Sequence, residues 1–460
     1  METTRNDSIQ IMSKELIKPS SPTPDHLKKL KLSLLDQLSP PVYISLVFFY
    51  GADELKGMTG SNDHSQIRRV LKRSLSNVLT TYYPLAGKID SENFTVDCND
   101  SGVEFIEARS RHRLKDVIEN PKLESFQKYL PTDPLGGIYR GEGTLFMAQV
   151  SIFDCGGVAI GACVSHIIAD GASFVKFMHA WAATCRGGNP DPDPHFGVMA
   201  RFLPARDLSD SNISPSLLLG NDKLVSKKFV FDREKLSLLK QEASGRGFPS
   251  TGSLDDYYVR DPTGVEVVTA FIWKHYIENK LFDDAKKIFV AHMVNIRSRA
   301  SPSLEMEHTF GNGCFMTTAW TPKYNDRVPK LHELVSELRK AIKTIDREYI
   351  RESCDGDRYL RDLGEVCDAV MEGEGEGFLF SSWFRFPIYE VGFGWGRPLW
   401  VGTTPLLLNN LAIFMDVISG DGIEVSINML PDDLHAFEER LELITTSDKV
   451  LVASDYVINS

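Results

Sequence analysis

The chain has 460 residues, of which 42% are hydrophobic and 25% are charged, so it can build sizeable cores in two or three domains. Its formal net charge of −12 disfavours nucleic acid or an anionic membrane surface as a partner, and no apolar run is long enough to cross a bilayer. The seven cysteines are scattered without a C-x-x-C pair, which argues against a disulfide framework and a zinc ribbon. The polar, charged first residues lack a signal-peptide core, so we expect a cytoplasmic protein.

The first half of the chain is predicted to alternate strands with helices. A nearly continuous apolar run at 41–50 is typical of a buried strand. From residue 65 onward, apolar residues at helical spacing mark one face of a helix, and four Lys and Arg residues on its other face indicate a solvated surface. Alternation over 93–108 predicts a hairpin. Two apolar runs, 145–154 and 158–164, predict neighbouring strands.

Residues 189–220 are dense in Pro, Asp and Ser and have no sustained periodicity, which indicates a crossover between two halves. We therefore divide the chain into an N-terminal half (1–188), a crossover (189–225) and a C-terminal half (226–460). The elements predicted for the C-terminal half are a strand at 226–231, a capping box at 263–266 that opens a helix, a strand at 287–296, one long helix at 329–351, a loop at 372–377, two strands within 411–430 and a last helix at 434–443.

The chain between its strand at 158–164 and the helix that begins near Gly171 carries a histidine and an aspartate. An imidazole titrates near neutrality, so His166 can accept a proton from a hydroxyl or an amine. Asp170 can orient that imidazole, or it can cap the following helix by accepting backbone N–H bonds. A polar loop held between buried elements is where a rigid scaffold usually presents chemistry.

Two motifs, one in each half, carry a resemblance to a known family. Residues 166–171 resemble the H-x-x-x-D-G signature of coenzyme A-dependent acyltransferases, and residues 391–398 resemble the D-F-G-W-G motif of the plant BAHD acyltransferases. The similarity continues at 83–88 and 295–299 and so spans nearly the whole chain. It is greatest to members of the family that act on alkaloids.

This resemblance implies an α/β fold of two similar chloramphenicol-acetyltransferase-like halves, each a mixed sheet with flanking helices, with a channel between them. The implied reaction is the transfer of an acyl group, most simply acetyl, from an acyl-coenzyme A to a hydroxyl of a plant specialised metabolite such as an alkaloid. The expected partners are these two substrates. We also expect a monomeric protein that has no metal and no permanently bound cofactor. Coenzyme A is expected at a cluster of Lys and Arg residues near the channel mouth, although the sequence does not assign them.

The family's roles carry over to individual residues. His166 is implied as the general base and Asp170 as support for its loop, in a direct transfer between two bound substrates. Trp395, or a backbone amide near it, is a candidate donor to the oxyanion, with buried packing as the equally weighted alternative for the indole. Gly394 belongs to the same tunnel or structural motif. Asn312, in a segment that resembles a tunnel-lining F-G-N, can equally belong to a plain turn between strands.

One residue departs from the family pattern. Gly392 stands where the family has an aspartate that pairs with an arginine, and that arginine matches Arg297. The resemblance implies that Arg297 lies far from the site of acyl transfer, and we expect Gly392→Asp to stabilise the protein modestly by restoring the pair. The departure also leaves open a non-catalytic ligand-binding member of the family. A metal-dependent hydrolase with His166 and Asp170 as ligands is a further alternative.

Overall fold

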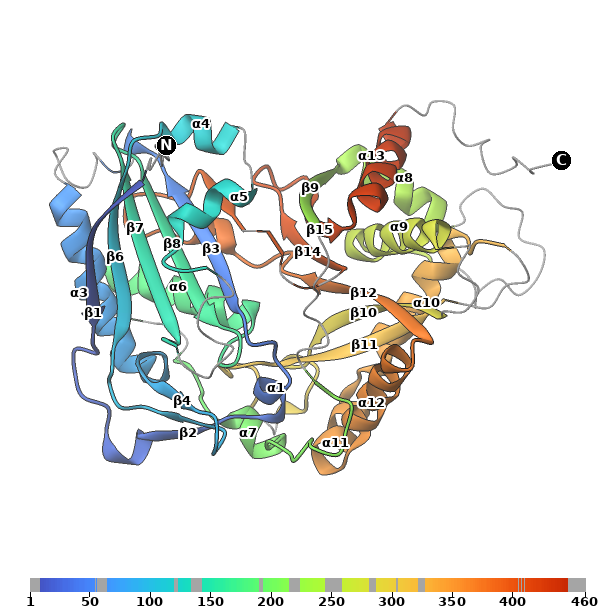
Figure 1. Cartoon of the computed structure of the whole chain (residues 1–460), viewed down its shortest axis with the longest axis horizontal. Helices are drawn as coiled ribbons and strands as arrows, with labels where there is room; N and C mark the ends of the chain where they lie inside the picture. The colour runs from blue at the N-terminus through green and yellow to red at the C-terminus, as the bar shows by residue number, and fades with distance from the viewer. Residues whose placement is uncertain are drawn as a thin grey trace, which may run out of the picture.

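The computed structural model contains two large mixed sheets, which lie next to one another in Figure 1 with helices packed against each. Among the residues that the structure describes, no helix is long and apolar enough to span a membrane. The described residues are 9–53, 55, 64–119, 123–133, 143–189, 193–214, 224–244, 259–280, 287–302, 305–321, 327–403, 405–406, 408 and 410–445. The polar start of the chain and parts of the predicted crossover lie outside these ranges.

The first sheet has six strands, of which only β6 and β7 run parallel to each other. Every residue of β3, β7 and β8 is buried, because helices or turns cover both faces of the sheet. The continuous apolar runs predicted as strands are therefore confirmed as its central strands. In spatial order the strands are β1 (Ile9–Ile17), β6 (Val103–Ser110), β7 (Phe146–Phe153), β8 (Val158–Ser165), β3 (Tyr43–Tyr50) and β13 (Trp400–Gly402).

Alternate residues of the central strands enter two different cores. Phe48 of β3 packs in the core shared with α3 (His64–Thr81) and α6 (Gly171–Cys185), which contact each other. Phe49 points the other way and packs with α4 (Leu114–Glu119), α5 (Leu123–Phe126) and the 3-10 turn η3 (Gln127–Tyr129). This period-two alternation is the ordinary geometry of a strand. A short loop then joins the end of β8 to the start of α6.

The second sheet also has six strands, and its parallel pairs are β10 with β12 and β12 with β14. The helices α8 (Arg233–Ala243), α9 (Gly264–Asn279), α10 (Leu331–Thr344) and α13 (Pro431–Thr445) share one core with it. Phe289 and Ala291, on the other face, pack against α12 (Arg358–Met371). The strand order is β11 (Cys314–Trp320), β10 (Lys287–Asn295), β12 (Gly375–Ser382), β14 (Leu411–Asp416), β15 (Gly422–Met429) and β9 (Val225–Asp232).

Smaller elements join the two halves. A three-stranded sheet is formed by β2 (Lys29–Lys31), β5 (Thr95–Asp97) and β4 (Lys88–Asp90), near the short helices α1 (Leu34–Gln37) and α7 (Val198–Phe202). β13 belongs to the C-terminal part of the sequence but pairs with β3 in the first sheet. The predicted α/β fold of two similar halves is confirmed, whereas the division at 188 and 225 stays a prediction.

Three local predictions are wrong. The predicted hairpin at 93–108 does not form, because β5 pairs with β2 and β4 while β6 pairs with β1 and β7. The long helix at 329–351 is two helices, since Asp346 accepts a hydrogen bond from the Tyr349 N–H and caps a new helix, α11 (Arg347–Asp355). The predicted loop at 372–377 contains the start of β12, where Gly377 leaves room for the Phe289 ring.

Candidate active site

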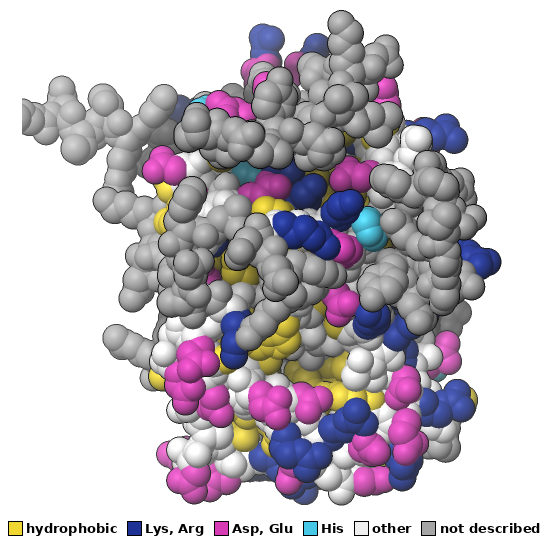
Figure 2. All heavy atoms as spheres, turned by 90° about the vertical axis from the view of Figure 1, so that its right-hand side faces the viewer, with side chains coloured by type: hydrophobic (Ala, Val, Ile, Leu, Met, Phe, Trp, Pro, Cys, Tyr) yellow, Lys and Arg dark blue, Asp and Glu magenta, His cyan; other side chains and the backbone are white. Residues whose placement is uncertain are grey.

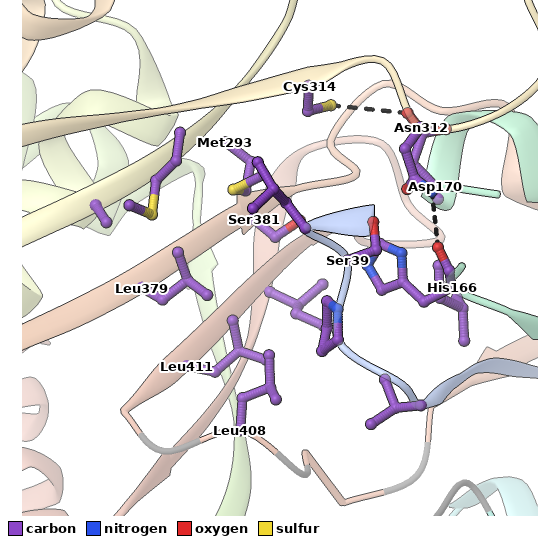
Figure 3. Close-up of a pocket in the computed structure, with 18 of the residues that line it drawn as sticks. Ser39, His166, Asp170, Met293, Asn312, Cys314, Leu379, Ser381, Leu408 and Leu411 are labelled. Carbon is purple, nitrogen blue, oxygen red and sulfur yellow. Dashed lines mark hydrogen bonds between the residues drawn. The ribbon is translucent and has the colours of Figure 1, made fainter. Parts of the chain in front are cut away.

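His166 follows β8 directly, and its backbone is held at two points. Its N–H donates to the carbonyl of Val42 at 2.9 Å, and its own carbonyl accepts from the side-chain amide of Asn312 at 2.7 Å. Figure 3 shows the imidazole extending from this loop toward the cavity. Its Nδ1 atom is buried and has no hydrogen-bond partner among the residues that the structure describes. These two hydrogen bonds of His166 therefore hold its backbone and not its ring.

The cavity that His166 lines has a volume of about 430 Å³ and lies between the two halves. Residues of β3 and the loop before it form one wall, and residues of β10, β12 and β14 form the opposite wall. The predicted space between the halves is therefore confirmed. Most of its side chains are apolar, including Phe289, Ala291, Met293, Leu379 and Leu411. Among the lining residues that the structure describes, none is Lys or Arg, and Asp170 is the single carboxylate.

The cavity reaches the surface beside α12. Val370 of that helix lines the cavity and is 37% exposed. Figure 2 shows hydrophobic side chains at the floor of a hollow on this side of the molecule, with charged side chains of both signs around it. An apolar cleft with a few polar groups at one end is the usual form of a small-molecule site.

Asp170 caps α6, as predicted, and both of its carboxylate oxygens accept hydrogen bonds. Its Oδ1 accepts from the Ser173 N–H at 2.8 Å, while Oδ2 accepts from the Arg297 guanidinium at 2.8 Å and from the Gly313 N–H at 3.0 Å. Burial alone would raise the pKa of this carboxyl, but the Arg297 charge and these donors outweigh it and hold the pKa below its ordinary value of 3.8. The Asp170 carboxylate is therefore ionised and directed at α6 and Arg297.

Arg297 lies beside the site, so the expectation that it is remote is wrong. Its guanidinium is 4% exposed and donates to Asp170, to the Ser173 hydroxyl and to the carbonyls of Thr309 and Gly311, at 2.8–3.0 Å. The physical reason is that a buried guanidinium needs an anion and several acceptors, and the loop around Asp170 supplies all of them. This network ties the second half of the chain to the loop that carries His166.

Asn312 connects His166 to a residue that the sequence reasoning missed. Its side-chain amide donates both to the His166 carbonyl and to the carboxylate of Asp36, at 2.9 Å, and its backbone N–H also donates to Asp36. Asp36 is 7% exposed and completes a capping box with Ser33 at the start of α1. The S-x-x-D spacing of Ser33 and Asp36 was the available signal, since it marks a helix start.

Burial is the largest influence on the pKa values of His166 and Asp36. Burial lowers the pKa of His166 below its ordinary value of 6.5, against the opposing effects of its own backbone, of the Asn312 side chain and of the Asp170 and Asp36 carboxylates. Burial likewise raises the pKa of Asp36, against the hydrogen bonds that it accepts from Ser33 and Asn312. A neutral imidazole is thus the stable form of His166 at neutral pH.

Gly171 and Cys314 were also not predicted as site residues. A Cβ atom on Gly171 would stand 2.7 Å from the ring of Trp383, which lines the cavity, so the glycine of the motif allows that indole to lie over the start of α6. The thiol of Cys314 lines the cavity and donates to Asp170 at 3.8 Å. Both contacts join residues more than a hundred positions apart, which no local pattern reveals.

The glycine-rich segment of the second motif lies elsewhere. Trp395 is 2% exposed and stacks on Phe393, and Tyr50 meets both rings edge-on within the first core. Gly394 has a φ of 111°, a conformation in which a side chain brings strain. None of residues 392–396 lines the cavity. The structure therefore brings His166, Asp170, Arg297 and Asn312 together and places Trp395, Gly394 and Gly392 apart from them.

Gly392→Asp is expected to destabilise the protein, which reverses the sequence-based expectation. A Cβ at this position would stand 2.9 Å from the carbonyl oxygen of Gly396, and a backbone oxygen cannot rotate away. The usual partner is also taken, since Arg297 binds Asp170. We expect a loss of about 1–3 kcal/mol in the free energy of unfolding, the scale of local backbone strain, measured by chemical denaturation.

Two further variants serve as controls for Gly392→Asp. Gly392→Ala should lose stability as well, because the obstruction is steric and not electrostatic. Gly364→Ala, where the nearest atom to a new Cβ is 3.9 Å away in the middle of α12, should be neutral or stabilising. A more stable Gly392→Asp protein would contradict this account and point to a new ion pair with Arg186, which donates to the Gly392 carbonyl.

Comparison with known proteins identifies the family. The model of the "Transferase family" matches residues 7–444. Stemmadenine O-acetyltransferase of Catharanthus roseus is 37% identical over 93% of this chain and 95% of its own length. Vinorine synthase of Rauvolfia serpentina is 37% identical over 95% of this chain and 98% of its own length.

Solved structures agree with these matches. The crystal structure of vinorine synthase aligns with a TM-score of 0.76 and 36% identity, over 93% of this chain and 96% of that one. TRI101 of F. graminearum, solved with ethyl coenzyme A, aligns with a TM-score of 0.67 at 16% identity, over 91% of this chain and 98% of that one, which supports the fold alone. The chain therefore belongs to the Transferase family, the BAHD acyltransferases, and is an acyl-coenzyme A-dependent O-acyltransferase.

Proposed function

We propose that this enzyme transfers an acetyl group from acetyl-coenzyme A to a hydroxyl of a plant alkaloid, with His166 as the general base. The observation that carries the proposal is the neutral, buried imidazole of His166 at the polar end of an otherwise apolar cavity. The names of stemmadenine O-acetyltransferase and vinorine synthase support the acceptor class. We further propose a monomeric, cytoplasmic enzyme.

The proposed reaction is a direct transfer between two bound substrates. His166 takes the proton of the acceptor hydroxyl, and the oxygen attacks the thioester carbonyl. The resulting oxyanion collapses, the carbon–sulfur bond breaks, and the protonated His166 returns its proton to the departing thiolate. Holding both substrates in one cavity supplies the proximity that a bimolecular reaction in water lacks.

The other residues of the site act by position. Asn312 fixes the His166 carbonyl, and Arg297 with Asp170 fixes the start of α6, so the loop that carries the imidazole is held at both ends. The donor of hydrogen bonds to the oxyanion stays unassigned in this proposal. Trp395 would have to leave its packed position between Tyr50 and Phe393 to reach the cavity.

The test is release of free thiol from acetyl-coenzyme A in the presence of a panel of alkaloid and terpenoid alcohols. Thiol release that depends on one acceptor class, with a matching ester product, supports the proposal. Tight binding of an alcohol without thiol release would instead favour a non-catalytic binding protein. Gly392, which had raised that alternative, does not line the cavity. No cluster of three or more His, Cys, Asp or Glu that could hold a metal is present among the described residues.

The pH dependence of the reaction should reflect His166. Because burial lowers its pKa, the neutral base persists as the pH falls, and the acid limb of kcat/KM is expected below pH 6.5. The measurement uses a neutral, non-ionising alcohol as acceptor, so that only groups of the enzyme and the donor titrate. Circular dichroism at each pH serves as the control for folding. An acid limb above pH 6.5 in a folded enzyme would contradict the assignment.

Donor binding is expected to weaken as salt is added. The described lining of the cavity has no Lys or Arg, so the phosphates of coenzyme A must meet basic residues at its mouth, where ion pairs are partly screened. The KM for acetyl-coenzyme A should therefore rise with sodium chloride. Acetyl-pantetheine lacks the nucleotide phosphates and is the matched control, with a KM that should change much less. Equal salt dependence of the two donors would contradict a basic mouth.

A further inference from the structure

A polar cluster outside the cavity contains an unusual lysine. It lies on the face of the first sheet that α4, α5 and η3 cover, opposite α6. Lys128 Nζ is 3.3 Å from Nε2 of His112, and Nδ1 of His112 lies 3.4 Å from both the Tyr129 hydroxyl and the Ser110 hydroxyl. Gln149 of β7 donates to the Lys128 carbonyl at 3.0 Å and holds the turn in place. The amine thus meets a histidine ring rather than a carboxylate.

The surroundings of Lys128 disfavour its charged form. No ion pair to Lys128 forms among the residues that the structure describes, whereas the partly exposed Lys72 and the more buried Lys228 each bind a glutamate. Its ammonium also lies over the Tyr129 ring, 5.6 Å from the ring centroid. Burial lowers the pKa of Lys128. Lys128 as a whole residue is partly exposed, which a reaction with a thioester in solution requires.

The neighbouring titratable groups leave His112 ready to accept a proton. Burial lowers the pKa of His112, and the charge of Lys128 lowers it further, against the opposing effect of Asp116 on α4. The imidazole is therefore neutral at neutral pH and has one nitrogen, Nε2, directed at the lysine. Asp133, on the following segment, accepts a hydrogen bond from the Gln127 side chain.

We propose that Lys128 is an acylation site, at which its amine takes an acyl group directly from a thioester such as acetyl-coenzyme A while His112 accepts the proton. The amine nitrogen attacks the thioester carbonyl, and a carbon–nitrogen bond forms. The nitrogen then passes a proton to Nε2 of His112, the carbon–sulfur bond breaks, and the thiolate leaves. His112 afterwards gives its proton to that thiolate or to water. The products are one acetyl-lysine and one free thiol.

This activity is separate from transfer to an alcohol. Lys128 is not among the residues that line the cavity, so it does not need His166 or the acceptor. Acylation removes the positive charge and replaces an ammonium that is poorly solvated by a neutral amide, which suits the half-buried position. The donor is the thioester that the enzyme already uses.

The experiment incubates the full-length protein with acetyl-coenzyme A and follows acetylation of each lysine by peptide mass spectrometry. Lys115 is the internal control, since its side chain is 77% exposed and lies on α4 near the cluster. Lys128 is expected to react several-fold faster than Lys115 at pH 7. The ratio should shrink as the pH approaches 10.5, the ordinary pKa of lysine, because exposed amines then also lose their protons. A Lys128 rate equal to or below that of Lys115 at pH 7 overturns the proposal.

Two variants test the proton acceptor and the route of the acyl group. His112→Gln should slow Lys128 toward the rate of Lys115 and leave Lys115 unchanged; an unchanged Lys128 rate would remove His112 from the proposal. In a His166→Ala background, Lys128 should be acetylated at its original rate. Loss of that acetylation would mean that the acyl group arrives through the catalytic cavity, which contradicts direct transfer. Because acetylation of Lys128 is measured without an alcohol acceptor, this experiment can fail or succeed independently of the proposed transfer to an alcohol.

Discussion

His166→Ala is expected to reduce turnover by roughly 10²–10⁴-fold, the usual effect of removing a general base. His166 is the one histidine among the described residues that line the cavity, and its neutral imidazole can accept the proton of the acceptor hydroxyl there. The affinity for acetyl-coenzyme A should change little, because His166 is not a partner for the phosphates. Initial rates of thiol release, with donor affinity from calorimetry, measure both quantities.

A second histidine provides the control for this variant. His179 lies on α6, the helix that follows the His166 loop. Its ring binds the Pro387 carbonyl, and neither residue lines the cavity. His179→Ala should therefore retain turnover close to that of the unmodified protein. If a correctly folded His166→Ala protein turned over at nearly the original rate, His166 would not be the base and the proposed mechanism would be lost.

The prediction of the fold from the sequence succeeded where burial alone decides the structure. The strands β3, β7 and β8 are buried along their whole length, and their continuous apolar runs are visible in the sequence. The prediction failed where the structure depends on which strands pair with each other. β5 and β6 alternate as a hairpin would, yet β5 pairs with β2 and β4 and β6 pairs with β1 and β7, and β13 crosses to the first sheet. Local alternation reports that a strand exists but not which strand it meets.

The same limit applies to the site. The positions of His166 and Asp170 follow from the five residues between a strand and a helix, and the cap by Asp170 is local. The partners of these residues are not local, since Arg297 reaches Asp170 across 127 positions and Asp36 reaches Asn312 across 276. Asp36 carried only the signal of a helix cap, so its role as the second anchor of Asn312 became visible only in the fold.

Arg297→Met is expected to be among the most destabilising single substitutions in this protein. The pair with Asp170 is almost fully buried, with side-chain exposures of 4% and 8%, and removal of one partner leaves a buried charge without its counterion. Such a change typically costs about 3–5 kcal/mol in the free energy of unfolding. The carbonyls of Thr309 and Gly311 also lose the donors that they share with this guanidinium. Denaturant titration measures the loss, and turnover should fall with it because the His166 loop is anchored here.

The pH dependence and a second variant distinguish this pair from ordinary surface ion pairs. The folded-state pKa of Asp170 lies below 3.8, so its ionised form contributes stability above that pH, and the contribution is lost as the pH falls through the lowered pKa. The difference in the free energy of unfolding between the original protein and Arg297→Met should therefore persist from neutral pH to about pH 4 and shrink in stronger acid. Arg351→Met, which breaks an exposed pair with Glu348, should change stability little. Adding Asp170→Asn to Arg297→Met should recover part of the loss, because it removes the unpaired charge. No recovery in the double variant would show that Arg297 stabilises the fold through its carbonyl contacts and not through Asp170.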